Sequence, residues 1–192
     1  LPSPKVIMQA LSEVKPNVVI AVPLVIEKIY KSKIQPILEK EGIKFLMKVP
    51  GLNQVLLNKV KAELIQAFGG EFYEVIIGGA AFNKEVESFF KKMAFPFTVG
   101  YGMTECAPII TYDDWKEEKL HSCGKAAPNM EVRIDSDNPS QVPGEIQVKG
   151  ANVFLGYFKN EEATREVFTE DGWFRTGDMG ILDEDGCLFI KG

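Results

Sequence analysis

The sequence predicts an α/β protein in two parts. Residues 1–115 form part of a mostly parallel, layered sheet with helices, and residues 116–192 form a small antiparallel, β-barrel-like subdomain. The first part alternates apolar, β-branched runs with helical stretches, as parallel sheets covered by helices do. The second part alternates polar and apolar residues between turns rich in Gly, Pro, Asn and Asp, which is typical of antiparallel strands with one face in water. The chain has 192 residues and is 45% hydrophobic, which is enough for a core and argues against disorder.

The first elements follow from apolar runs and prolines. Residues 6–14 predict a helix that ends before Pro16. Residues 17–23, NVVIAVP, are continuously apolar and β-branched, which predicts a strand buried on both faces. Residues 24–42 predict a helix with a kink or break at Pro36, because proline lacks the N–H that a helix interior uses.

The next elements lead to a glycine-rich segment. Residues 53–68 predict an amphipathic helix that Gly69-Gly70 ends. Its apolar stripe comprises Leu57, Val60, Leu64 and Phe68. Residues 74–78 predict a strand, Asn83 an N-cap for the helix that follows, and residues 97–99 a strand that runs into GYGMTE.

The second part is predicted from three alternating segments. They are MEVRID (130–135), GEIQVKG (144–150) and CLFIKG (187–192), and turn-forming residues separate them.

Composition excludes several classes of protein. The net charge of −5 and the pI near 5.1 argue against a nucleic-acid binder, which usually carries a basic face. The three cysteines, Cys106, Cys123 and Cys187, contain no CxxC pair, so neither a disulfide scaffold nor a zinc site is expected, and a reducing cytoplasm fits best. No apolar run approaches the ~18 residues of a membrane span, and we find no signal peptide.

Two glycine-containing segments follow predicted strands. GYGMTEC (100–106) brings two glycines, an aromatic ring, a hydroxyl and a carboxylate together where a strand ends; the alternative is a tight turn whose Thr104 and Glu105 face water. IIGGAAF (76–82) places two glycines between a strand and a helix, where backbone can approach a flat ligand. The alternative there is a simple strand-to-helix turn. The segment matches neither GxxxxGK[ST] nor GxGxxG.

A lone carboxylate, Asp178, lies between glycines in DGWFRTGDMG, at a predicted turn. A fixed carboxylate can accept two hydrogen bonds, which suits a ribose diol. The alternative is an Asx turn. The nearby DEDG (183–186) predicts a hairpin turn, because the spacing of a calcium loop is absent.

Five segments occur together in a fixed order. They are VGYGMTE, GKAAPNMEVRI, PGEIQVKGANVFLGYFKNEEAT, DGWFRTGD and DEDGCLFIKG. With them the sequence resembles the adenylate-forming superfamily, which includes acyl-CoA synthetases, adenylation domains of peptide synthetases and luciferase-type enzymes. The stretch NVVIAVPLVIEKIYKSKIQPIL is most similar to long-chain fatty acid–CoA ligases, although Leu24 stands where that family usually has arginine.

The resemblance implies an ATP-dependent acid–thiol ligase. A carboxylic acid, here a long-chain fatty acid, attacks the α-phosphate of ATP to give an acyl-adenylate and pyrophosphate, and coenzyme A then takes the acyl group. The implied cofactors and substrates are ATP, Mg2+, coenzyme A and the fatty acid, in the cytoplasm, without nucleic acid. Peripheral contact with a membrane is left open. The alternatives are an adenylation domain that loads a carrier protein and a non-catalytic nucleotide-binding relative.

The resemblance also implies roles for individual residues. Glu105 matches the magnesium carboxylate, Thr104 the hydroxyl that contacts phosphate, and both count as catalytic. Tyr101 matches the ring on adenine, and Asp178 the acid that holds the ribose hydroxyls. The nucleotide-binding set is completed by Gly78, Gly79 and Ala80 as a wall beside the base, Gly102 (which, with Gly100, leaves room for the substrate acid), and Met103.

The expected phosphate loop, hinge and catalytic lysine of the family are not found in these residues. The chain begins LPSPKV and stops at LFIKG, directly after a strand-like run. We therefore expect an internal piece of the large N-terminal domain of a longer protein, which has no ligase activity alone.

Overall fold

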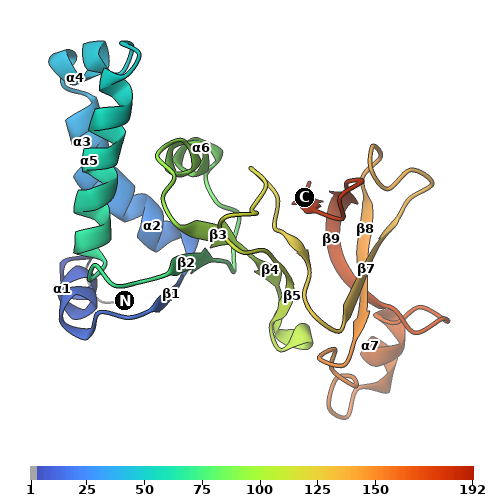
Figure 1. Ribbon diagram of the computed structural model, residues 1–192. Coiled ribbons are helices and arrows are strands. Elements are labelled where there is room, and N and C mark those ends of the chain that lie inside the picture. Colours follow the sequence, from blue (N-terminus) through green and yellow to red (C-terminus); the bar gives the residue numbers. More distant parts are fainter. Residues whose placement is uncertain (1–3) are drawn as a thin grey trace. The chain divides into compact units, whose positions relative to one another are not determined.

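The computed structural model describes residues 4–192 (Figure 1). The chain divides into two compact units, residues 1–97 and residues 98–192, and each is described by itself. The boundary that the sequence predicts, between residues 115 and 116, lies inside the second of these units. No helix among residues 4–192 is long and apolar enough to cross a membrane.

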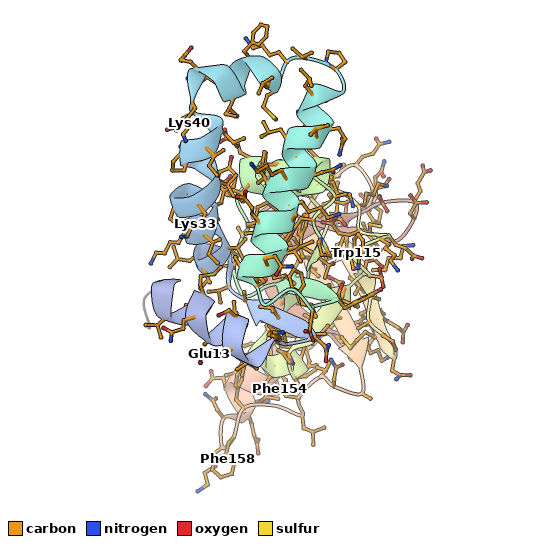
Figure 2. The ribbon with its side chains drawn as sticks, turned by 60° about the vertical axis from the view of Figure 1, so that its left-hand side comes forward. Glu13, Lys33, Lys40, Trp115, Phe154 and Phe158 are labelled. Carbon is orange, nitrogen blue, oxygen red and sulfur yellow. The ribbon has the colours of Figure 1, made fainter. Side chains whose placement is uncertain are left out.

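The first unit alternates helices with short strands, as predicted. Its elements are α1 (Pro4–Val14), β1 (Val18–Ala21), α2 (Pro23–Ile29), a π-helical turn (Tyr30–Ile34), α3 (Gln35–Leu38), α4 (Glu41–Leu46), α5 (Leu52–Ala67), β2 (Glu74–Ile77), α6 (Lys84–Lys92) and the start of β3 (Phe97–Val99). Helix α5 runs beside the α2–α3 stretch in both views (Figures 1 and 2).

The helix predicted over residues 24–42 is irregular in the turn that leads into Pro36. Regular helix α2 gives way to the π-helical turn at Tyr30, six residues before Pro36. Pro36 follows the π-helical turn by two residues; it has no N–H for a helical hydrogen bond, and in a regular α-helix its ring would clash with the carbonyl group of Ser32, which lies in that turn. The residues after α3 form a separate helix, α4.

Helix α5 confirms the predicted amphipathic pattern. The four residues of the stripe are all at most 5% exposed. Gly69 and Gly70 follow with φ of 100° and 81°, a left-handed backbone that favours glycine and ends the helix. Asn83 caps α6 as predicted, because its side-chain oxygen accepts hydrogen bonds from the N–H groups of Glu85 and Val86.

The first sheet has the strand order β1-β2-β3, and β1 pairs with β2 in parallel. Strand β1 is an outer strand of this sheet, so the predicted burial on both faces is wrong for the structure described. Only Val19 in β1 is buried, whereas Ile20 is 80% exposed. A continuous apolar run predicts a strand, but it does not say how many neighbours the strand has.

Hydrophobic packing in the first unit centres on phenylalanine rings beside β2 and β3. Phe90 is fully buried and contacts the rings of Phe82, Phe95 and Phe97 at centroid distances of 5.0–6.3 Å. This cluster packs around the start of β3.

The second unit is antiparallel, as predicted. One sheet has the order β4-β5-β6 and the other β10-β9-β8-β7, and all the pairings given for them are antiparallel. The elements are β4 (Tyr101–Gly102), a 3-10 turn (Thr104–Cys106), β5 (Ile109–Tyr112), β6 (Lys125–Ala126), β7 (Met130–Asp135), β8 (Gly144–Gly150), α7 (Glu161–Glu166), β9 (Phe174–Leu182) and β10 (Leu188–Ile190). The core of the unit comprises Cys106, Ile110, Met130, Ile134, Ile146, Val148, Phe174 and Leu188.

Strand β9 corrects one prediction. The glycines around Asp178 indicated a turn, whereas the structure places Asp178 within a nine-residue strand. The pairing of β9 explains why: β9 lies between β8 and β10, and Gly180 lies against Ile146, where a Cβ atom would crowd the isoleucine side chain. The glycine therefore serves close packing in the sheet rather than a reversal of the chain.

Candidate nucleotide-binding site

Tyr101 and Asp178 meet in the second unit although 77 residues separate them. The Tyr101 hydroxyl donates a 2.7 Å hydrogen bond to Oδ2 of Asp178. Tyr101 comes from β4 and Asp178 from the middle of β9. Burial, together with this hydrogen bond to a carboxylate, raises the pKa of Tyr101 well above its usual value, so the phenol is a neutral donor at physiological pH.

Thr176 anchors the Asp178 side of this pair. Its hydroxyl donates to the carbonyl oxygen of Ile146 on β8 (2.8 Å) and accepts from the backbone N–H of Asp178 (3.2 Å). The backbone of Asp178 is thus held by Thr176, and its carboxylate by Tyr101. A fixed carboxylate has lone pairs left for further donors, which suits a vicinal diol.

The segment after β4 forms a closed turn. The N–H of Met103 donates to the carbonyl oxygen of Pro108 (2.8 Å), and Ala107 adopts a left-handed conformation with φ of 54°. A Cβ atom on Gly102 would overlap the Pro108 carbonyl group, so the chain's own backbone occupies the space beside this glycine. This is a structural reason for Gly102, in addition to the room for substrate that the resemblance implies.

The turn presents Thr104 and Glu105 differently. Thr104 is exposed and Glu105 is half-buried. Cys106 is fully buried in the core, and burial raises the pKa of its thiol to about 11, so this cysteine packs as an apolar residue and is no nucleophile. The 3-10 turn therefore buries the Cys106 side chain and leaves the Thr104 hydroxyl and the Glu105 carboxylate accessible.

Glu105 is held by a loop that sequence reasoning missed. The Tyr157 hydroxyl donates to Oε1 of Glu105 (3.1 Å), and the N–H of Phe154 donates to the carbonyl oxygen of Glu105 (2.7 Å). Asn152 adds two hydrogen bonds from Nδ2, to the carbonyl oxygens of Cys106 (2.6 Å) and Ile109 (2.9 Å). Nothing in local spacing indicates these contacts, because Tyr157 and Glu105 are 52 residues apart.

Gly78, Gly79 and Ala80 belong to the first unit, unlike the other candidates. They follow β2, and the N–H of Gly78 extends the parallel pairing by donating to the carbonyl oxygen of Ala21 (3.2 Å). Gly79 has φ of 83°, which favours glycine, and both Gly79 and Ala80 are exposed. The backbone of this segment is therefore open to a ligand.

Donor chemistry limits how a metal could bind. Across residues 4–192, no group of three or more His, Cys, Asp and Glu side chains is arranged to hold a metal ion. Magnesium needs no such group, since it is commonly held by one or two carboxylates together with substrate phosphates and water. Glu105, with the Thr104 hydroxyl beside it, fits that requirement. A zinc ion would need three or four protein ligands, which these residues do not supply.

The other residues of DGWFRTGD are structural. Phe174 is 2% exposed in the core. Trp173 lies under the Arg133 guanidinium, 4.4 Å from ring centroid to Cζ, and the same guanidinium forms two hydrogen bonds with Asp171. Arg175 pairs with Glu145 at 2.8 Å. We therefore assign no ligand to these four residues beside Asp178.

Comparison with known proteins identifies the class to which this fold and site belong. The family described as AMP-binding enzyme matches residues 1–158. The chain belongs to this family, that of the adenylate-forming enzymes.

Particular relatives are acid–CoA ligases of different substrate classes. The chain is 33% identical to the long-chain-fatty-acid–CoA ligase FadD15 of Mycobacterium bovis, over 98% of this chain and 34% of the relative. It is 35% identical to the 2-succinylbenzoate–CoA ligase of Listeria innocua, over 95% of this chain and 38% of the relative. A malonyl-CoA ligase solved with methylmalonyl-CoA and AMP bound superposes with a TM-score of 0.70 and 26% identity, over 100% of this chain and 36% of that chain. The chain thus spans about a third of the length of the curated relatives it matches.

Proposed function

We propose that this chain is the adenosine- and metal-binding part of an ATP-dependent acid–CoA ligase. The observation that carries the proposal is the Tyr101–Asp178 pair, which joins an aromatic ring and a fixed carboxylate from two strands at 2.7 Å. A base needs a flat face and a ribose needs an acceptor for two hydroxyls, and this pair offers both side by side. Membership of the AMP-binding family supports the same ligand.

Each residue has a part in the proposed reaction. The Tyr101 ring stacks on adenine. The resemblance also assigns Gly78, Gly79 and Ala80 of the first unit a role at the base. Asp178 accepts hydrogen bonds from the ribose hydroxyls, and Thr104 donates to a phosphate oxygen. Met103 and Gly102 complete the nucleotide-binding segment.

Magnesium would be held by Glu105 together with phosphate oxygens. When bound, the ion neutralises phosphate charge, which lets an anionic carboxylate approach the α-phosphorus atom. The protein's own contribution is to place one carboxylate oxygen at a fixed position on a rigid turn. The reaction forms an acyl–phosphate bond, releases pyrophosphate, and then exchanges AMP for the sulfur of coenzyme A.

The acid substrate is proposed to be a long-chain fatty acid. This choice follows the resemblance of residues 17–38 and the similarity to FadD15, whereas the similarity to succinylbenzoate and malonyl ligases favours smaller acids. The named relatives are all CoA ligases, which favours coenzyme A over a carrier protein as acceptor. The three cysteines form no disulfide with one another, which fits the cytoplasm that we propose for the protein.

The test is ATP–pyrophosphate exchange by the full-length parent protein. The panel contains fatty acids of several lengths, 2-succinylbenzoate, malonate and 4-coumarate, each with magnesium and with a no-acid control. We expect exchange that depends on one class of acid, followed by thioester formation when coenzyme A is added. A protein that binds ATP without exchange with any acid would instead be a non-catalytic nucleotide-binding relative.

A further inference from the structure

The loop between β8 and α7, residues 151–160, is tied to the Glu105 turn at several points. Asn152 and Phe154 bind the backbone of the turn, and Tyr157 binds the side chain of Glu105. Backbone contacts alone would suffice to hold two loops together. The additional bond from the Tyr157 hydroxyl acts on a single functional group, the carboxylate of Glu105.

Two contacts besides the bond to Glu105 hold Tyr157 in place. Its ring packs edge-on against Phe154 at 4.9 Å between centroids, and Phe154 contacts the buried ring of Phe174 at 5.4 Å. Its backbone N–H donates to Oγ1 of Thr164 in α7 (2.9 Å). Gly156 makes this approach sterically feasible, because a Cβ atom there would overlap the Thr164 side chain. Packing of Phe174 against Phe154, and of Phe154 against Tyr157, therefore positions the Tyr157 hydroxyl beside Glu105.

The neighbouring residues of the loop are placed differently. Leu155 is 99% exposed and Phe158 is 89% exposed, whereas the hydroxyl of Tyr157 turns back to Glu105. Figure 2 shows Phe158 at the outer end of this loop and Phe154 nearer the strands. Phe154 thus packs against the core, Tyr157 binds Glu105, and Phe158 contacts solvent.

We propose that Tyr157 is a positioning residue for the magnesium carboxylate. Its hydroxyl fixes one oxygen of Glu105, and the carboxylate keeps further lone pairs that could bind a cation. This inference rests on the proposed function, in which Glu105 holds magnesium. A carboxylate that is already oriented loses less rotamer freedom when it binds a cation, and outer partners of metal ligands typically contribute ~10–100-fold to metal affinity.

Tyr157 is 38% exposed, and its hydroxyl is an uncharged donor. It therefore places no second negative charge beside Glu105.

The experiment measures the magnesium dependence of ATP binding to the full-length parent protein by isothermal titration calorimetry, without an acid substrate. Tyr157→Phe keeps the ring against Phe154 and the backbone bond to Thr164, and removes only the hydroxyl. We expect the magnesium concentration that half-saturates the enhancement of ATP binding to rise ~10-fold. Binding of AMP without magnesium should stay as in the wild type.

Two variants make the outcome specific. Phe158→Ala alters an exposed ring in the same loop and should leave the magnesium dependence unchanged. Glu105→Gln should remove the enhancement by magnesium altogether; if it does not, the proposed metal role of Glu105 fails. If Glu105→Gln removes the enhancement but Tyr157→Phe leaves the half-saturating concentration unchanged or lowers it, Tyr157 is structural or competes with the metal, and the inference is overturned. Circular dichroism and melting temperature establish that each variant is folded.

Discussion

The hydrogen bond between Tyr101 and Asp178 can be tested by a single substitution, Tyr101→Phe. The change keeps the aromatic ring that would stack on adenine and removes the hydroxyl that donates to Asp178 at 2.7 Å. A hydrogen bond to a charged group contributes ~1.5–3 kcal/mol. Part of this loss falls on folding stability and part on the orientation of the carboxylate, so we expect ATP affinity to fall by roughly 3- to 10-fold, which corresponds to ~0.7–1.4 kcal/mol.

The assay compares two nucleotides on the full-length parent protein. ATP presents both ribose hydroxyls, whereas 2′,3′-dideoxy-ATP presents none. If Tyr101 orients Asp178 toward the ribose, Tyr101→Phe weakens binding of ATP and leaves binding of the dideoxy analogue as in the wild type. An equal loss for both nucleotides would refute the reasoning, because it would place the effect on stacking or on global stability.

Alkaline unfolding provides an independent readout of the same bond. Because the pKa of Tyr101 is raised in the folded protein above its usual value of 10.0, the unfolded chain loses this proton first as the pH rises. The stability associated with the protonated phenol is complete below pH 10.0 and is lost progressively above it. Tyr101→Phe should therefore reduce the slope of the unfolding free energy against pH in this alkaline range, and an unchanged slope would contradict the buried, bonded phenol.

Three further substitutions test the site and its supports. Asp178→Ala should raise the KM for ATP because two charge-assisted hydrogen bonds of ~1.5–3 kcal/mol each are lost, before non-additivity; an unchanged KM would exclude the ribose role. Asp171→Asn should lower the melting temperature at neutral pH, since hydrogen bonds from Arg133 lower the pKa of Asp171 below its usual 3.8; the difference from the wild type should shrink as the pH falls below that value. Gly102→Ala should destabilise the protein by ~1–3 kcal/mol, because the new methyl group would overlap the Pro108 carbonyl group. Unchanged stability with a raised KM for the acid would instead favour the role of Gly102 in substrate access.

Elements with a local cause could be predicted from the sequence. The stripe of α5 repeats at helical spacing, and all four of its residues are buried. Asn83 caps α6 through its own side chain, so its role depends only on the next three residues. The change to antiparallel pairing was also predictable, because alternation of polar and apolar residues reflects a sheet with one wet face.

Features set by distant partners could not be predicted in this way. Residues 174–182 resemble a turn because glycines flank Asp178, and only the pairing with β8 and β10 makes them a strand. The apolar run in β1 indicates a strand, but its exposed Ile20 depends on which neighbours the strand has. For the π-helical turn at Tyr30–Ile34, Pro36 predicts an irregularity but not its π-helical form.

The candidate site shows the same division between local and distant causes. The resemblance assigns roles to Tyr101, Glu105 and Asp178, but each role requires a side chain fixed to within a fraction of an ångström. The Tyr101 hydroxyl binds the Asp178 carboxylate, and the Tyr157 hydroxyl binds the Glu105 carboxylate; 77 and 52 residues separate the two partners of these pairs. Strand β9 and the loop after β8 therefore supply one partner of each pair, which the GYGMTE segment does not contain. It follows that removing the Tyr157 hydroxyl should act on metal binding although Tyr157 is assigned no contact with the nucleotide, which distinguishes a positioned site from one that the short motif forms alone.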